Sequence, residues 1–280
     1  LAVITAPDKP AGRGMKMQQS EVKKFALAHS IKVLQPTNLK SPEFINELKT
    51  INPDLQVVVA FRMLPEVVWN LPPMGTINLH ASLLPQYRGA APINHAIING
   101  ENETGITTFR LKHDIDTGNI LLQEKVPITE SDNAATLHDK LMSEGSKLLV
   151  RTVNGLRDGT LQEISQDSIM THTPFKHAPK IFRENCEIKW DDTVVNIYNL
   201  VRGLSPKPGA FTFLNGTRII ITESEKDNST PEAPPGAYIT DGKTFLKFAA
   251  TDGYLSILKL KPEGKGVMNI EDFLRGRRDL

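Results

Sequence analysis

Asn78, His80 and Asp116 are the candidate catalytic residues of this sequence. Asn78 and His80 stand two residues apart at the end of an apolar run, in the stretch INLHASLLP. Because side chains alternate between the two faces of a strand, both should project from the same side of a strand end. Asp116 lies in the turn HDIDTG that follows the next expected strand, where a carboxylate could orient the imidazole or stabilise its charge. An amide that stabilises an oxyanion, an imidazole that accepts a proton and a neighbouring carboxylate together suit acyl transfer to an amine.

The same residues could also have a purely structural role. An Asn and a His two apart occur often by chance, and a lone histidine usually has a structural role. All three residues nevertheless fall at the carboxyl ends of expected strands, where an open α/β sheet forms its ligand crevice. His113 and Asp114, in the same turn, are interpreted as turn and surface residues. The spacing of Asp114, Asp116 and His80 matches no familiar set of metal ligands, so no metal is expected.

The first half of the chain, which contains Asn78 and His80, alternates between expected strands and expected helices. Strands are expected at 1–5, 32–34, 55–61 and around 77–80, and helices at 21–29, 41–49 and 89–99. Ser41 suits the N-cap position, with Pro42 at the first helical position. The run LQVVVAF, at 55–61, is typical of a strand buried on both faces. This alternation predicts a Rossmann-like, mostly parallel α/β sheet.

The second half of the chain has a different pattern. Strands at 105–111 and 120–126 and the longest helix, at 136–156, complete the first domain, to which we assign residues 1–159. Residues 160–185 contain Pro174 and Pro179 and lack a strong period, so they are interpreted as an interdomain linker. One helix, at 194–202, then precedes short alternating runs separated by turn dipeptides such as Asn215-Gly216. The runs are 210–214, 217–222, 236–239, 245–249 and 254–260. They predict a small OB-like β-barrel in residues 186–280.

Composition and charge narrow the class of protein. The 280 residues, 39% of them hydrophobic, can bury a sizeable core, and 33 basic against 32 acidic residues give a net charge of +1. Bulk charge therefore argues neither for nor against an anionic partner, and contacts with nucleic acid must come from local patches. No run of 18 or more apolar residues and no charged-then-apolar leader occurs, so a cytoplasmic protein without membrane association is expected. The single cysteine, Cys186, excludes an intrachain disulfide and a cysteine-built metal site.

Three segments, NLHASLLP, YRGAAPI and HDIDTG, resemble the signature segments of the folate-dependent formyltransferases. The RGAAPI portion and the loop PDKPAGRG resemble those members that act on methionyl-tRNA, and the similarity extends over nearly the whole chain. The resemblance implies that Asn78, His80 and Asp116 are the catalytic trio. It also implies a formyl donor, 10-formyltetrahydrofolate, and an acceptor, the methionine amino group of initiator tRNA. The expected protein is thus a monomeric transferase of translation initiation.

The resemblance also assigns binding residues. The formyl-folate site would be lined by Ser82, Leu83, Leu84 and Pro85. Residues 6–16 taken alone are typical of a solvated surface loop rich in proline and glycine. The resemblance instead places Arg13 and Lys16 in a loop that approaches the acceptor stem of the tRNA. Lys180 resembles a family lysine near the end of the tRNA.

The chain departs from the family pattern in two places. Family members begin with a strand, a glycine-bearing turn and a helix, a unit of about 30 residues with its crossover, and we expect this chain to lack that first strand and helix. The segment AFRMLP places Phe61, Arg62 and Met63 near the folate pocket, where a glycine and small apolar residues are expected.

Two alternative functions remain open at this point. A related folate-dependent formyltransferase could act on a small amine, such as an amino sugar nucleotide or glycinamide ribonucleotide, and would not need the Arg13 loop or the barrel. A non-catalytic RNA-binding protein on the same scaffold would have no reason to combine Asn78, His80 and Asp116. Phosphate contacts to tRNA would make binding fall with added salt more steeply than binding of a small amine.

Overall fold

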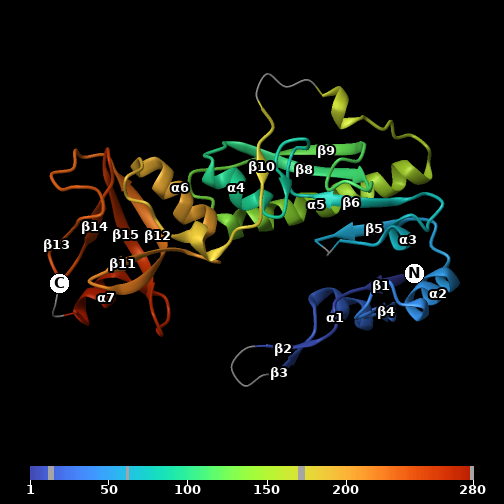
Figure 1. Ribbon diagram of the computed structural model, residues 1–280, viewed down its shortest axis with the longest axis horizontal. Coiled ribbons are helices and arrows are strands. Elements are labelled where there is room, and N and C mark those ends of the chain that lie inside the picture. Colours follow the sequence, from blue (N-terminus) through green and yellow to red (C-terminus); the bar gives the residue numbers. More distant parts are fainter. Residues whose placement is uncertain (12–15, 61–62, 170–173, 278–280) are drawn as a thin grey trace. The chain divides into compact units, whose positions relative to one another are not determined.

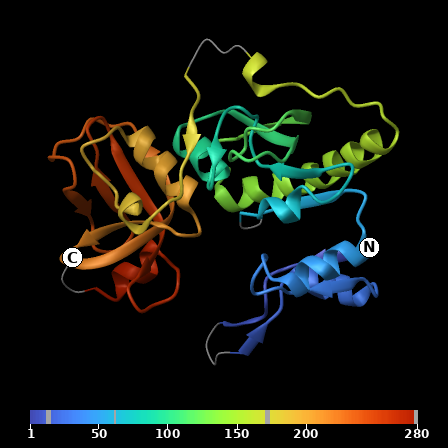
Figure 2. The same cartoon turned by 45° about the vertical axis from the view of Figure 1, so that its right-hand side comes forward.

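The structure is a computed structural model that describes residues 1–11, 16–60, 63–169 and 174–277. The chain forms two compact units. Unit 1 comprises Leu1–Leu79 and Phe109–Asp114, and unit 2 comprises His80–Thr108 and Ile115–Leu280. Figure 1 labels the elements, and Figure 2 gives a second view of them.

Unit 1 begins with a parallel pair of short strands. β1 (Ala2–Ile4) pairs with β4 (Lys32–Leu34), and α1 (Glu21–Ala28) connects them in the chain. α2 (Pro42–Ile51) begins after Ser41, whose Oγ accepts a hydrogen bond from the Phe44 amide at 3.3 Å, so the predicted N-cap is confirmed. α3 (Glu66–Trp69) contributes Val68 to the same core. The buried core residues of this segment are Leu34, Leu39, Phe44, Leu48 and Val68.

Two short strands flank the basic loop near the N-terminus, where the sequence predicted no strand. β2 (Lys9–Ala11) and β3 (Lys16–Gln18) pair antiparallel, with Pro10 opposite Met17. A two-stranded ribbon has only edge strands, and edge strands tolerate proline, so Pro10 does not prevent the pairing. The backbone of Lys16 lies in β3, whereas Arg13 lies outside the described residues.

A four-stranded sheet has the order β5-β6-β8-β9. Its strands are β5 (Gln56–Val59), β6 (Thr76–His80), β8 (Glu103–Arg110) and β9 (Ile120–Pro127). β5 and β6 pair in parallel, as the alternation of strands and helices predicts. The prediction that β5 is buried on both faces is wrong, because Val57 and Val59 are 43% and 50% exposed. β5 is the edge strand of this sheet, and an apolar run implies two covered faces only for a central strand between helices.

Two helices of unit 2 begin and end within three residues of the predicted bounds. α5 (Ala134–Arg157) is the longest helix and packs on β9, alongside which it runs in both ribbon views (Figures 1 and 2). Asn133 caps it: its Oδ1 accepts a hydrogen bond from the Thr136 amide at 3.0 Å, and the Thr136 Oγ1 accepts one from the Asn133 amide at 2.9 Å. α4 (Pro92–Ile98) begins with its proline and ends before Gly100, which has a φ of 70°.

The C-terminal part of unit 2 is a curled antiparallel sheet with the order β11-β12-β15-β14-β13, and β16 pairs with β15. The strands are β11 (Ala210–Leu214), β12 (Thr217–Asp227), β13 (Tyr238–Thr240), β14 (Leu246–Ala249), β15 (Tyr254–Pro262) and β16 (Met268–Asn269). α6 (Val194–Leu204) packs on β12, and α7 (Ile270–Arg275) follows β16. This half-barrel confirms the OB-like prediction. β16 and α7 did not figure in it, since elements of two and six residues show little periodicity.

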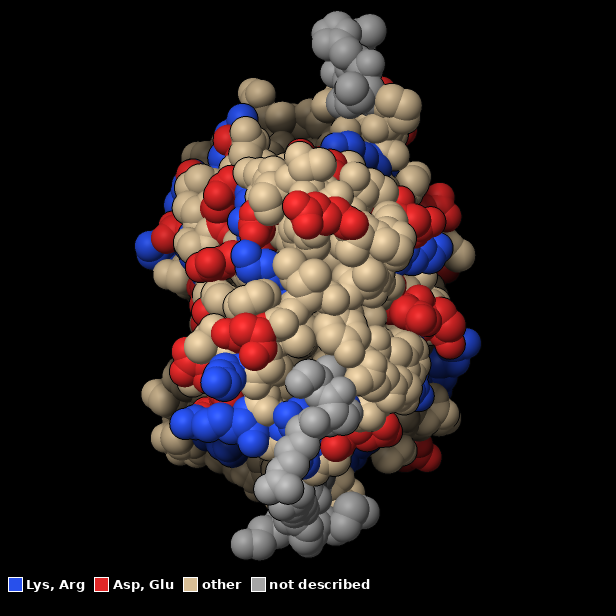
Figure 3. Space-filling model, turned by 90° about the vertical axis from the view of Figure 1, so that its left-hand side faces the viewer, with Lys and Arg blue, Asp and Glu red and all other residues tan. Residues whose placement is uncertain are grey.

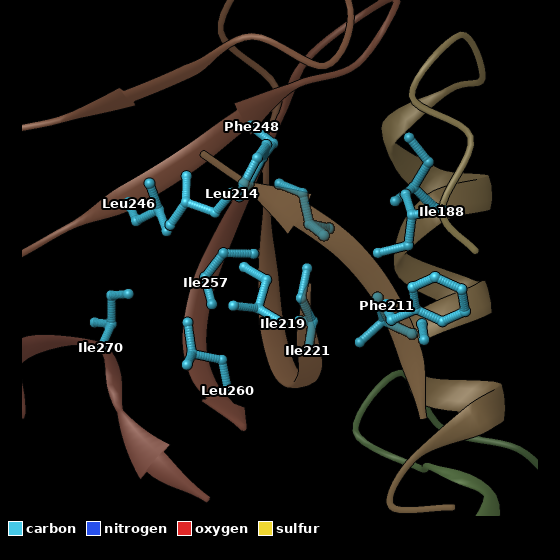
Figure 4. Packing of buried hydrophobic residues seen from close by; sticks show 14 of the residues in the cluster. Ile188, Phe211, Leu214, Ile219, Ile221, Leu246, Phe248, Ile257, Leu260 and Ile270 are labelled. Carbon is cyan, nitrogen blue, oxygen red and sulfur yellow. The ribbon is translucent and has the colours of Figure 1, made fainter. Parts of the chain in front are cut away.

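The core of the C-terminal sheet is built from alternating strand residues. Figure 4 shows Ile219 and Ile221 of β12 beside Ile257 and Leu260 of β15, all buried in one cluster. The turn between β11 and β12 is Asn215-Gly216, with φ values of 47° and 76°. Both residues adopt a left-handed backbone conformation, as the tightest hairpin turn requires. The dipeptide therefore fixes the pairing of Leu214 with Thr217.

Three short elements lie between α5 and α6, in and just beyond the segment predicted as a linker. They are η1 (Gln166–Ser168), β10 (His177–Ala178) and η2 (Arg183–Cys186). β10 pairs in parallel with β7 (Arg88–Gly89), a two-residue strand that follows β6 in the chain. Within the described ranges, no helix combines the length and apolarity needed to cross a membrane.

Candidate active site

His80 is the last residue of β6, and its side chain is buried, with 6% of the residue exposed. The imidazole Nε2 lies 2.9 Å from the carbonyl oxygen of Tyr87. Because a carbonyl oxygen can only accept, Nε2 must carry the hydrogen of this bond. In the neutral ring Nδ1 is then the basic nitrogen. The contact with Tyr87 therefore selects the tautomer of His80.

Asp116 faces the basic nitrogen of this ring. Its Oδ2 lies 3.7 Å from Nδ1 of His80, and its side chain is only 12% exposed. The same Oδ2 accepts a hydrogen bond from the Gly89 amide at 2.9 Å. At 3.7 Å the carboxylate is too far for a hydrogen bond to a neutral imidazole but close enough to stabilise a protonated one. His80 and Asp116, which are 36 positions apart in the numbering, thus form the pair that the sequence predicts.

Tyr87 holds the carbonyl that orients His80. Tyr87 is 5% exposed and has a φ of 60°, a left-handed conformation that few residues other than glycine adopt. Its hydroxyl donates a hydrogen bond to Glu101 at 2.5 Å and accepts one from the Asn99 amide group at 3.1 Å. Burial, reinforced by the bond to Glu101, raises the pKa of the Tyr87 hydroxyl, so this group stays protonated. The side chain therefore anchors a backbone conformation that aims its carbonyl at the imidazole.

Asn78 lies two residues before His80 on β6, so both side chains project from the same face of the strand, as predicted. Its Oδ1 is buried and has no hydrogen-bond partner among the described residues. A buried amide oxygen without a hydrogen-bond partner costs free energy, so Asn78 is a group that a bound ligand could satisfy.

Ser82, Leu84 and Pro85, three of the four residues assigned to the folate site, are buried, and Leu83 is half-buried. The Ser82 hydroxyl donates to the Gln86 carbonyl at 2.6 Å. The Leu84 amide donates to Thr107 Oγ1 at 3.1 Å, and the Leu84-Pro85 peptide bond is cis. These contacts give the segment after β6 a defined backbone.

Several other residues singled out in the sequence are exposed, and others lie outside the described ranges. Lys180 is exposed, with Nζ 5.4 Å from the centroid of the Phe182 ring. Met63 is 76% exposed, and Phe61 and Arg62, like Arg13, lie outside the described residues. His113 and Asp114 are both exposed, which confirms their interpretation as turn and surface residues.

Sequence reasoning missed three residues that contact the His80–Asp116 pair or its backbone. Tyr87 and Gly89 lie inside the segment YRGAAPI, so the motif included them without indicating their role. Gln166, which hydrogen-bonds to the Asp116 carbonyl, stands 50 residues further along the chain in a segment without a pattern. No signal in the sequence pointed to it.

Two family models match the chain. The formyl transferase model matches residues 1–153, a stretch that includes His80 and Asp116. The chain belongs to the formyl transferase family. A second model, of the formyl transferase C-terminal domain, matches residues 180–278 and so takes in the curled antiparallel sheet.

Relatives of this formyl transferase match almost its full length. The methionyl-tRNA formyltransferase of Bacteroides fragilis is 50% identical over 281 residues, which cover 99% of this chain and 87% of the relative. The methionyl-tRNA formyltransferase of Porphyromonas gingivalis is 45% identical over 282 residues, which cover 98% of this chain and 87% of the relative.

Solved structures share the fold at much lower identity. The N-formyltransferase from Helicobacter canadensis, in complex with folinic acid and dTDP-3-aminofucose, has a TM-score of 0.64 and 21% identity, covering 89% of this chain and 85% of its own. HypX from Aquifex aeolicus, in complex with tetrahydrofolic acid, has a TM-score of 0.63 and 17% identity, and covers 89% of this chain. This formyl transferase spans 43% of the HypX chain. At such identities the likeness establishes the architecture alone.

Proposed function

We propose that this formyl transferase moves the formyl group of 10-formyltetrahydrofolate to the methionine amino group of initiator tRNA, in translation initiation. The observation that carries the proposal is the 50% identity to a methionyl-tRNA formyltransferase over 99% of the chain. The matched stretch spans the C-terminal sheet as well as positions 80 and 116. The Helicobacter canadensis enzyme, whose structure holds an amino sugar nucleotide, shares the architecture at only 21% identity, so the level of identity favours the tRNA-directed function.

The chemistry follows from the groups around His80. As the methionine amine attacks the formyl carbon, negative charge develops on the formyl oxygen, and the Asn78 amide is the donor that would stabilise it. Nδ1 of His80 takes the proton released by the amine, because Nε2 is already bound to the Tyr87 carbonyl. Asp116, 3.7 Å from Nδ1, stabilises the resulting imidazolium. When the bond between the formyl carbon and N10 of the folate breaks, the same proton can pass to N10, so the transfer is balanced.

The proposal also assigns the residues that bind the two substrates. The formyl-folate would lie against Ser82, Leu83, Leu84 and Pro85, whose backbone is held by the contacts described above. Arg13, Lys16 and Lys180 would contact the tRNA. We assign residues 1–159 to the catalytic domain, 160–185 to the connecting segment and 186–280 to the C-terminal domain.

The mixed surface charge supports binding of tRNA through individual basic residues rather than through one large basic surface. Figure 3 shows a face of the molecule on which Lys and Arg side chains are interleaved with Asp and Glu side chains. The whole chain carries a net charge of +1. Phosphate groups would therefore be bound by individual basic residues, each adding to the salt dependence of binding.

The test follows formyl transfer to three acceptors in parallel. The protein is incubated with 10-formyltetrahydrofolate and methionyl initiator tRNA, methionyl elongator tRNA or a dTDP-amino sugar, and the formylated product is measured. Transfer to the initiator tRNA with little transfer to the others is expected. Transfer only to the amino sugar would support the small-amine alternative, and tRNA binding without transfer would refute the enzymatic function.

A further inference from the structure

Gln166 is a buried polar side chain whose donor and acceptor sites all have hydrogen-bond partners. It opens η1 and is 2% exposed. Its Nε2 donates to the carbonyl oxygens of Asp116, at 2.9 Å, and Gly118, at 2.7 Å. Its Oε1 accepts from Nε and Nη2 of Arg88, at 3.0 and 2.7 Å. Arginine can only donate and a carbonyl can only accept, so the orientation of the amide is determined by its partners.

These bonds join the two chain segments that meet at the Asp116 carboxylate. Arg88 is followed by Gly89, whose amide donates to Oδ2 of Asp116 at 2.9 Å. Asp116 has a φ of 55°, a conformation that costs free energy in a residue other than glycine and persists only where its surroundings impose it. Gln166 binds the carbonyl of Asp116 itself and that of Gly118, two residues further on. It therefore supplies part of what holds Asp116 in this conformation.

Gln166 is itself held on both sides by backbone pairing. Before it, Ile164 exchanges two hydrogen bonds with Ile120, at 2.8 and 2.9 Å. After it, β10 pairs with β7. Both described stretches around residues 170–173 are thus paired with other parts of unit 2, at Ile164 and at His177–Ala178. A residue so fixed can transmit position to the carboxylate that it supports.

We propose that Gln166 is a positioning residue, which sets the place of the Asp116 carboxylate against His80 through the Asp116 and Gly118 carbonyls. This inference rests on the proposed catalytic roles of Asp116 and His80. A positioning role predicts a loss of turnover with little change in the KM for either substrate. A role limited to anchoring the connecting segment predicts a loss of stability without a specific loss of turnover.

The test compares Gln166→Glu with Gln162→Glu. The first variant keeps the size of the side chain and an oxygen for Arg88 but removes the N–H group that binds the two carbonyls. The second adds the same charge at an exposed glutamine of the same segment, four residues away. For Gln166→Glu we expect kcat to fall on the order of tenfold or more, with both KM values within about twofold of those of Gln162→Glu.

Two further measurements separate positioning from a general loss of structure. The Gly89 amide proton reports the bond to Asp116 Oδ2, so its NMR resonance should shift in Gln166→Glu and stay in place in Gln162→Glu. Adding Gln166→Glu to Asp116→Asn should cause no further loss of kcat, because the group being positioned is already neutral. A kcat of Gln166→Glu within twofold of the control, or an additive loss in the double variant, would overturn the inference.

The outcome for Asp116→Asn distinguishes this inference from the proposed function. An inactive Asp116→Asn together with a normal Gln166→Glu would refute the positioning role alone. Normal turnover in Asp116→Asn would refute the catalytic role of Asp116, and the positioning role with it.

Discussion

Gly89→Ala provides a quantitative test of the arrangement around Asp116. A Cβ at Gly89 would lie 2.4 Å from the carbonyl oxygen of Ala178 and 2.9 Å from its carbonyl carbon, and Gly89 has a φ of 126°. Both neighbours are backbone atoms, so the pairing of β7 with β10 must open. The left-handed conformation costs about 1–2 kcal/mol with a side chain present. The hydrogen bonds lost with the pairing, such as that from the Ala91 amide to the Ala178 oxygen at 3.1 Å, contribute about 1 kcal/mol each.

These contributions add to a destabilisation of about 3–5 kcal/mol, against a total stability of about 5–15 kcal/mol for a typical folded protein. Gly159→Ala is the matched control, because Gly159 has a φ of 65° and no atom within 4 Å of the added Cβ. It should cost about 1 kcal/mol, from backbone conformation alone. Urea unfolding of both variants gives the two free energies of unfolding, and their difference reports the contact with Ala178 together with the less favourable φ at position 89.

Turnover should separate the two variants as well. Gly89 donates to the Asp116 carboxylate, so Gly89→Ala should lower kcat by about tenfold or more in the fraction that remains folded, while Gly159→Ala should not. Equal destabilisation by the two substitutions, or full turnover in folded Gly89→Ala, would refute the reasoning.

Three further predictions concern the chemistry, the stability and the tRNA. Asn78→Ala and His80→Ala should each lower kcat on the order of a hundredfold or more with little effect on folate binding, and near-normal turnover in both would contradict their roles. Although burial disfavours its charged form, hydrogen bonds led by that of Lys140 lower the pKa of Asp132 from 3.8 to about 2. The ionised Asp132 should therefore contribute about 2 kcal/mol to the free energy of unfolding. This contribution is complete above the pKa of the unfolded state and is lost as the pH falls through about 2. The free energy of unfolding of Asp132→Asn, measured from pH 6 to 2, should lack this dependence. Lys180→Ala should raise the KM for tRNA and reduce the salt dependence of binding by about one phosphate contact, with unchanged KM for the folate.

Local sequence information predicted most of the elements. Ser41 and Pro42 indicated the start of α2, the bounds of β4 matched the prediction, and Asn215-Gly216 located the tightest turn of the C-terminal sheet. Caps, periods and turn dipeptides depend on residues within a few positions of one another, so they can be read from the chain alone. The motif residues His80 and Asp116 were found in the same way, through short segments.

Apart from elements too short to show a period, the wrong or missing predictions depend on partners elsewhere in the chain. The exposure of Val57 follows from the edge position of β5, which the apolar run does not encode. Tyr87 acts through a carbonyl, and any residue type carries one, so its contact with His80 leaves no signature in the sequence.

The chemical groups available to this protein, an amide, an imidazole and a carboxylate at the ends of strands, could be identified from the sequence. How these groups are held became apparent from the folded chain. Gln166 reaches Arg88 across 78 residues and Asp116 across 50, and it does so through an amide with four hydrogen-bonding sites and no periodic pattern. The physical reason is that such bonds depend on direction and distance in space, which arise only when the sheet and the segment after α5 have folded together.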